Sequence, residues 1–280
     1  MTDFIEHLEE VASQYDAIVF DQWGVLHDGS APYSKAPAAI SALNRAGLPV
    51  AVLSNSGKRA EPNETRIKRI GFAEAQFEYV MTSGEALWRD VWSAQVPHSH
   101  FFAIERSPGD AAAWADGLDS VVFSPSVDTA EAILLMGLPD GSSAASWKQV
   151  LEKALQENLT VYCSNPDRAS PRGGGKTVVS PGALAHFYQE SGGAVVFYGK
   201  PHAPVFKSLE TALGADKILM VGDSLEHDIA GAQNVGWDSL LVQNGLYAER
   251  FASGDREQTL SDLCASHAVL PPTFSIKELS

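Results

Sequence analysis

The sequence predicts an α/β protein with a doubly wound parallel sheet and a second α/β domain inserted into it. Three observations lead to this class. Short apolar runs recur along the chain, several of them end in a polar residue, and segments with helical spacing separate them. Apolar runs bounded by turn residues are typical of buried strands, and strands that alternate with helices favour parallel βαβ units. Such sheets place reacting groups just past the carboxyl ends of their strands.

Length and composition exclude several classes of protein. A chain of 280 residues predicts one large or two moderate domains, and 45% hydrophobic content suits an ordinary globular protein. The net charge of −15 argues against a nucleic-acid partner. No apolar run is long enough to span a membrane, and the acidic start is unlike a signal peptide. Two cysteines, Cys163 and Cys264, are too few for a disulfide scaffold, so we expect a reducing, cytoplasmic location.

The first elements lead to a candidate nucleophile. Apolar residues at helical spacing predict a leading amphipathic helix over residues 3–14. The apolar run at 17–20 predicts a buried strand, and Asp21 follows it directly, at the lip of a crevice. Asp21 could equally cap the next turn, as Asp often does after a strand. Residues 26–30 are rich in turn formers and predict a small flap or hairpin.

The next unit repeats this arrangement. A helix capped by Ser34 and ended by Gly47 leads to a second apolar strand at residues 50–53. That strand runs into Ser54 and further polar residues. A strand, a helix and a strand in close succession favour a right-handed parallel unit. Two strands that end in polar residues are a stronger signal than one.

The middle of the chain could form a second α/β layer of its own. Helices near 63–71 and 83–94 come before it. We then expect strands at residues 101–104, 120–123, 132–138 and 159–163, with helices near 108–116 and 143–157 between them. A loop rich in Pro and Gly, residues 165–175, closes this region.

The last part of the chain supplies two more charged groups. We expect helices near 182–191 and 202–213, strands at 194–198, 217–222 and 239–242, and a Pro-containing tail. Lys200 follows the first of these strands, Asp223 follows the second, and Asp228 lies at a helix start. With Asp21 and Ser54, four separate strand ends now carry polar or charged residues, which is hard to explain by capping alone.

These residue types together suit phosphoryl transfer. Asp21 and Asp223 would repel each other at one crevice unless a cation lay between them, and Mg²⁺ prefers such hard oxygen ligands. A carboxylate can attack phosphorus to form an aspartyl-phosphate. Lys200 would screen the nucleophile and the transferring group, while the Ser54 hydroxyl would hold phosphoryl oxygens.

Four stretches resemble, in order, the four motifs of the haloacid dehalogenase-like (HAD) phosphatases: Asp21-Gln22-Trp23-Gly24-Val25, Ser54-Asn55-Ser56, Gly199-Lys200-Pro201 and Gly222-Asp223-Ser224-Leu225-Glu226-His227-Asp228. The insertion between the second and third motifs resembles the class IIA branch, which includes p-nitrophenyl phosphatase-like and sugar phosphatase-like enzymes. The resemblance covers nearly the whole chain. It implies a HAD-like, Rossmannoid core over residues 1–82 and 183–280, and a class IIA-type α/β cap over 83–182 that selects the leaving group.

The resemblance also implies roles for individual residues. Asp21 would be the nucleophile and a magnesium ligand, and Lys200 would bridge it to the phosphate. Asp223 would bind magnesium, with Asp228 as an outer ligand or as the group that orients Lys200. Trp23 would contribute its main-chain carbonyl to the metal.

The same resemblance places the substrate. Ser54 would bind the transferring phosphoryl group, and Asn55 and Ser56 would lie close to it, together with Lys200. We therefore expect a magnesium-dependent phosphatase that acts on a small phosphorylated metabolite, a sugar phosphate or a related phosphomonoester, through an aspartyl-phosphate. Related capped enzymes often pair through the cap, so a homodimer is possible.

Trp23 departs from the family pattern. Phosphatases of this family usually carry a second Asp two residues after the nucleophile, as general acid and base, and an indole N–H cannot do this. Such help is typically worth about 10²–10⁴-fold in rate. His27 or Asp28 could substitute, although a solvated flap accounts for both more simply. The alternative is a weakly active or inactive regulatory protein that binds a phosphorylated ligand.

Overall fold

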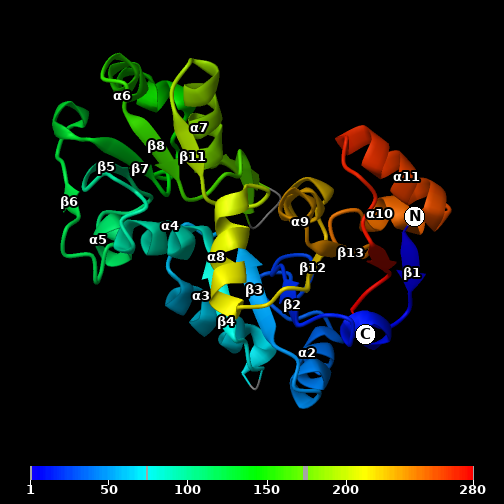
Figure 1. Ribbon diagram of the computed structural model, residues 1–280. Coiled ribbons are helices and arrows are strands. Elements are labelled where there is room, and N and C mark those ends of the chain that lie inside the picture. Colours follow the sequence, from blue (N-terminus) through cyan, green and yellow to red (C-terminus); the bar gives the residue numbers. More distant parts are fainter. Residues whose placement is uncertain (1, 74, 173–175, 280) are drawn as a thin grey trace. The chain divides into compact units, whose positions relative to one another are not determined.

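The computed structural model describes residues 2–73, 75–172 and 176–279, and the chain forms two compact units (Figure 1). The first unit comprises Met1–Ser54, Glu61–Met81 and Lys200–Ser280. The second unit comprises Asn55–Ala60 and Thr82–Gly199. Within the described ranges, no helix combines the length and hydropathy that crossing a bilayer requires.

A seven-stranded sheet forms the centre of the first unit, in the order β1-β14-β13-β12-β2-β3-β4 (Figure 1). Its strands are β1 (Asp3–Ile5), β2 (Ala17–Phe20), β3 (Val50–Ser54), β4 (Tyr79–Thr82), β12 (Ile218–Gly222), β13 (Asp238–Val242) and β14 (Phe274–Ile276). Strand β2 runs parallel to both β12 and β3, with Phe20 opposite Val221 and Val52. Every residue of these three strands is buried, so they read as continuous apolar runs in the sequence.

Helices connect these strands. They are α1 (Glu9–Ala12), α2 (Ala36–Arg45), α3 (Ala60–Ile67), α8 (Ala203–Leu213), α9 (Ala230–Val235), α10 (Ala248–Ala252), α11 (Arg256–His267) and two π-helical segments, η1 (Lys68–Phe72) and η4 (Leu225–Ile229). Their apolar side chains bury Ile18, Phe20 and Val52 of the sheet against residues such as Ile40 and Ile67, which forms the core of the unit.

The second unit is built on a five-stranded sheet in the order β11-β8-β7-β5-β6, and its strands pair in parallel. The strands are β5 (His100–Ile104), β6 (Val122–Phe123), β7 (Ala132–Leu135), β8 (Thr160–Cys163) and β11 (Val195–Phe197), and an antiparallel hairpin adds β9 (Ala169–Arg172) and β10 (Lys176–Val179). Its helices are α4 (Ser83–Trp92), α5 (Asp110–Trp114), the 3₁₀ turn η2 (Val127–Thr129), α6 (Ala144–Gln156) and α7 (Pro181–Glu190). Leu135, Leu151, Val161 and Tyr188 are central to its core.

The parallel α/β class predicted from the sequence is confirmed, and several elements differ from expectation. Residues 3–5 form an edge strand rather than a helix, because they pair with β14. The loop at 165–175 contains β9, and residues 173–175 lie outside the described residues. The tail carries α10, α11 and β14.

The division into units also differs from the predicted boundary. Residues 183–199, which the sequence analysis assigns to the core, belong to the second unit. The physical reason is that β11 pairs with β8, so this stretch completes the second sheet.

Candidate active site

Asp21 stands at the end of the central strand β2. Its main-chain N–H donates to the Val221 carbonyl at 2.9 Å, which continues the pairing with β12 by one residue. Its side chain keeps 16% exposure, while β2 itself is wholly buried. The carboxylate therefore lies at the carboxyl-end edge of the sheet, where the sequence predicted it.

Lys200 connects two of the three candidate carboxylates. Its Nζ lies 2.6 Å from Asp21 Oδ1 and 2.7 Å from Asp228 Oδ1, and its side chain is only 3% exposed. Burial by itself lowers the pKa of Lys200, but the two carboxylates more than offset this and raise it. Lys200 is thus a charged ammonium group held against Asp21.

The route by which Lys200 reaches this position differs from the prediction. Lys200 was expected at the end of a strand of the same sheet as Asp21. The strand before it, β11, belongs instead to the sheet of the second unit. Lys200 is the first residue of the chain's return to the first unit, in the connection that leads to α8.

Asp228 is fully buried and organises the end of β12. Its Oδ2 accepts the main-chain N–H groups of Asp223 and Ser224 at 3.2 and 3.1 Å, while its Oδ1 accepts from Lys200. A Cβ at Gly222 would lie 2.2 Å from the Asp228 Cβ, so only glycine permits this approach. Asp228 thus contacts Lys200 directly, a contact that the Lys200-orienting role, one of the two that the sequence left open, requires.

Two glycines enclose the Asp223 carboxylate. Its Oδ2 accepts the Leu246 N–H at 2.8 Å. A Cβ at Gly24 would lie 1.8 Å from this Oδ2, and a Cβ at Gly245 would lie 2.5 Å from it. Gly24 also has φ of +77°, which side-chain-bearing residues rarely adopt. Gly245 and Leu246 were not among the predicted site residues, although the Asn244-Gly245 pair shortly after the strand β13 is a turn signal that the sequence offers.

The three acidic side chains form one cluster. Ligand oxygens of Asp21, Asp223 and Asp228 lie within 4.8 Å of one another. Burial is the largest cause that raises the pKa of Asp21 to about 6, and the neighbouring Asp228 adds to it. Burial likewise raises the pKa of Asp223 to about 8, with Asp228 and Asp21 contributing. Crowded, buried carboxylates of this kind fit a hard divalent cation, which would favour their ionised forms.

Ser54 ends the neighbouring strand. It is 8% exposed and is the last residue of β3, which pairs with β2 in a register that places Val52 opposite Phe20. Asn55 and Ser56 belong to the second unit, where Asn55 Nδ2 donates to Asp167 Oδ1 at 2.8 Å.

Trp23 is half exposed, at 50%. Its ring covers Gly29, where a Cβ would lie 2.1 Å from the indole, and it packs edge-to-face on His27 with centroids 5.5 Å apart. The Arg66 guanidinium lies 5.9 Å from the ring. The indole therefore closes a compact loop, while the adjoining Gly24 backbone lies against Asp223.

The two residues that could have replaced the general acid, His27 and Asp28, make other contacts. His27 is fully buried, which corrects the expectation of a solvated flap, and its Nδ1 accepts the Gly29 N–H at 3.1 Å. Burial lowers the pKa of His27 to about 4. Asp28 is exposed as expected, but its Oδ1 accepts the Ala31 and Ser30 N–H groups, and these bonds lower its pKa to about 2. Near neutral pH, His27 is a neutral imidazole whose Nδ1 already accepts a hydrogen bond, and Asp28 is an ionised carboxylate of low pKa. Both are therefore poor at relaying protons.

The fold and the cluster define a class: proteins with a parallel α/β sheet in which an aspartate at a strand end lies beside a lysine and two further acids. Family models agree with this class. Residues 18–111 match a model described as haloacid dehalogenase-like hydrolase, and residues 197–266 match one described as HAD-hydrolase-like. The chain is a haloacid dehalogenase-like hydrolase.

Individual relatives extend over nearly the full chain. It is 26% identical to a glycerol-3-phosphate phosphatase of Gallus gallus over 296 residues, 96% of this chain and 91% of the relative. It is 27% identical to an acid sugar phosphatase of Staphylococcus aureus over 270 residues, 95% and 96% of the two chains. A HAD-like hydrolase from Brucella suis 1330 has a similar structure, with a TM-score of 0.78 at 27% identity, covering 99% of this chain and 100% of the other.

Proposed function

We propose that this hydrolase is a magnesium-dependent phosphatase that hydrolyses a small phosphorylated metabolite, a sugar phosphate or a related phosphomonoester. The observation that carries the proposal is the Asp21 carboxylate at the end of β2, with Lys200 Nζ at 2.6 Å and two further carboxylates in the same cluster. The names of the two relatives, a glycerol-3-phosphate phosphatase and an acid sugar phosphatase, support it.

The chemistry follows from the charges. An Asp21 oxygen attacks phosphorus, the bond from phosphorus to the ester oxygen breaks, and the leaving oxygen takes a proton from water. Water then attacks the aspartyl-phosphate, which releases inorganic phosphate and restores the carboxylate. Lys200 holds Asp21 and neutralises phosphoryl charge, while Ser54, Asn55 and Ser56 bind the equatorial oxygens.

We assign the metal to Asp21, Asp223 and the main-chain carbonyl of Trp23, with Asp228 behind them. The ion would neutralise the charge that accumulates on the transferring phosphoryl group. Mg²⁺ suits this oxygen-only donor set, because it prefers a few carboxylates together with water and a substrate phosphate.

We propose that the second unit is the cap that selects the leaving group. It contains a cavity of about 460 Å³, within the size range of small-molecule sites. Polar and charged residues such as Ser56, Arg106 and Asp140 share its lining with apolar residues such as Met136 and Leu138. The polar part of this lining could bind the hydroxyl groups of a sugar or glycerol leaving group.

Trp23 stands where related phosphatases usually carry the general acid and base, and this lowers the turnover rate that we expect. Because neither His27 nor Asp28 can relay a proton, we expect esters with good leaving groups to react fastest. A binding protein without turnover has no support from the two relatives, which are both named as phosphatases. A homodimer and a reducing, cytoplasmic location remain predictions; both cysteines are buried free thiols.

The test is phosphate release from p-nitrophenyl phosphate, acetyl phosphate, glycerol 3-phosphate and glucose 6-phosphate, each with Mg²⁺ and with EDTA. We expect Mg²⁺-dependent turnover that Asp21→Asn lowers roughly 10³-fold or more. Asp262→Asn, an exposed aspartate on α11, is the matched control and should leave turnover unchanged. Ordinary turnover by a purified Asp21→Asn protein would falsify the assignment of the nucleophile.

A further inference from the structure

A short segment, Asn55–Ala60, leaves the first unit directly after Ser54 and returns to it at Glu61. These six residues belong to the second unit. The strand before them, β3, and most of the helix after them, α3, belong to the first unit. Two residues of this segment, Asn55 and Ser56, are the proposed phosphoryl binders. Contacts within the second unit therefore hold a segment that carries two of the proposed phosphate-binding residues.

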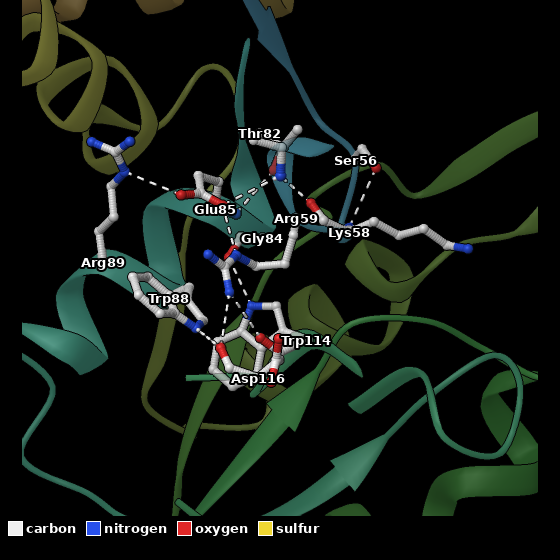
Figure 2. A network of polar contacts seen from close by, with 11 residues as sticks. Ser56, Lys58, Arg59, Thr82, Gly84, Glu85, Trp88, Arg89, Trp114 and Asp116 are labelled. Carbon is white, nitrogen blue, oxygen red and sulfur yellow. Dashed lines mark hydrogen bonds and ion pairs between the residues drawn. The ribbon is translucent and has the colours of Figure 1, made fainter. Parts of the chain in front are cut away.

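Arg59 makes several of these contacts at once (Figure 2). Its Nε lies 2.6 Å from Glu85 Oε2, and its guanidinium carbon lies 3.8 Å from the Trp88 ring centroid. Its Nη1 donates to the carbonyls of Trp114 and Asp116 at 3.4 and 3.3 Å. One planar guanidinium thus connects the segment to α4 and to the end of α5, a combination of fork and stacking contacts that lysine cannot reproduce.

Glu85 shares its carboxylate between Arg59 and the segment's own backbone. Its side chain is only 9% exposed, and its Oε2 also accepts the Ala60 N–H at 3.3 Å. Its other oxygen accepts from Arg89, whose side chain is 37% exposed, at 3.3 Å. Of the two arginines on Glu85, Arg59 alone belongs to the segment.

The start of α4 holds the segment's main chain directly. The Gly84 N–H donates to the Ser56 carbonyl at 3.1 Å, and Thr82 Oγ1 donates to the Lys58 carbonyl at 2.5 Å (Figure 2). A Cβ at Gly84 would lie 2.1 Å from the Gly57 carbonyl oxygen, so the two backbones are in close contact. The Lys58 N–H in turn donates to Ser56 Oγ at 3.3 Å.

We propose that Arg59 is a positioning residue for phosphoryl binding: through Glu85, Trp88 and the two carbonyls it holds segment 55–60 so that Asn55 and Ser56 present their groups to phosphate. The inference rests on the proposed function of that segment. Arg59 touches no substrate, and its effect reaches the phosphate only through the main chain of the segment.

The experiment compares Arg59→Gln and Arg59→Lys with Arg89→Gln, which removes the other cation from the same carboxylate. We expect Arg59→Gln to raise the KM for p-nitrophenyl phosphate and the inhibition constant of inorganic phosphate together, each about tenfold, with a smaller change in kcat. Arg59→Lys should recover part of this loss, and Arg89→Gln should cause none.

Hydrogen–deuterium exchange gives a readout that does not depend on turnover. Arg59→Gln should speed exchange in the peptide that spans residues 55–60 while the strands β5 and β7 keep their wild-type rates. Equal kinetic effects of the two glutamine variants, or a loss in kcat with unchanged phosphate affinity, overturn the inference.

Failure of the proposed function gives a different result. In that case the wild type releases no phosphate, and calorimetric titration with inorganic phosphate replaces the kinetics. Weaker phosphate binding by Arg59→Gln than by Arg89→Gln then supports the positioning role without turnover. Absence of phosphate binding in the wild type overturns it, because no phosphoryl site exists to be positioned.

Discussion

Two glycines, Gly24 and Gly245, determine where the Asp223 carboxylate lies. This carboxylate fits between Gly24 and Gly245 and accepts one N–H from Leu246, so its position depends on close backbone approach from two loops. In a buried cluster of acids, a small displacement of one carboxylate changes both its repulsion from the others and its fit to a cation.

Gly24→Ala tests this dependence, and Gly47→Ala is its matched control. Both glycines have similar positive φ, +77° and +73°, but a Cβ at Gly47 would meet nothing within 4 Å. Each substitution should cost about 1–2 kcal/mol of unfolding free energy from the backbone alone. Only Gly24→Ala should also weaken Mg²⁺ activation, by about 10–100-fold, because it displaces Asp223. Identical Mg²⁺ titrations of the two variants would contradict this account.

His27 should make stability depend on pH. Burial lowers its pKa from 6.5 to about 4, so between these values the unfolded chain binds more protons than the folded one. The contribution of neutral His27 to the free energy of unfolding should therefore be complete above pH 6.5. It should be lost as the pH drops toward 4, which lowers stability by at most about 3 kcal/mol. Urea denaturation of wild type and His27→Phe across this range measures the difference. Parallel curves for the two proteins would refute the assignment.

At the scale of elements, the turn from β12 into η4 and the connection before α8 are held together by one buried ion pair. Asp228 accepts two N–H groups from the turn and the ammonium of Lys200, so it joins two segments that are distant in sequence. A buried charge that loses its partner is costly, whereas an exposed pair contributes little.

Asp228→Ala should accordingly lower the free energy of unfolding by about 3–5 kcal/mol, since it removes one carboxylate from the buried Lys200 ammonium and the acceptor of the Asp223 and Ser224 N–H groups. Glu278→Ala is the comparison, because the Lys35–Glu278 pair is similarly short, at 2.6 Å against 2.7 Å for Lys200–Asp228, but its side chains are 52% and 41% exposed. That variant should lose about 0–1 kcal/mol. Denaturant titration decides, and similar losses in the two variants would exclude a special role for the buried pair.

For the whole molecule, the division into two units separates the proposed metal site from the proposed choice of substrate. All three clustered carboxylates and Lys200 belong to the first unit, and the 460 Å³ cavity belongs to the second. The chain passes between the units directly after Ser54 and directly before Lys200. Two residues of the proposed catalytic set are thus covalently adjacent to the second unit.

Mg²⁺ should therefore protect the two units unequally. At a concentration 100 times its dissociation constant, a ligand that binds only the folded state adds about 2.7 kcal/mol of stability. We expect slower hydrogen exchange in β2, β12 and η4 when Mg²⁺ replaces EDTA, and unchanged exchange in β5, β7 and β8. Asp223→Asn should abolish the effect. Protection spread evenly over both sheets would show that the ion does not act through this cluster.

Local sequence was sufficient to predict the three strands that lead to Asp21, Ser54 and Asp223. Strands β2, β3 and β12 are buried on both faces, so each is a short apolar run that stops at a polar residue, and this pattern is visible without any partner. The parallel class and the family followed from the same runs and from the order of the four motifs. The roles of the individual site residues remain predictions.

What the sequence alone determined was which segments become buried strands and which polar residues follow them, because burial on both faces selects residue types locally. Only the tertiary structure decided which strands pair. It made residues 3–5 an edge strand through β14, placed β11 in the second sheet, and buried His27 under Trp23. Pairing and burial of this kind depend on contacts between residues far apart in the chain, and no local pattern encodes them.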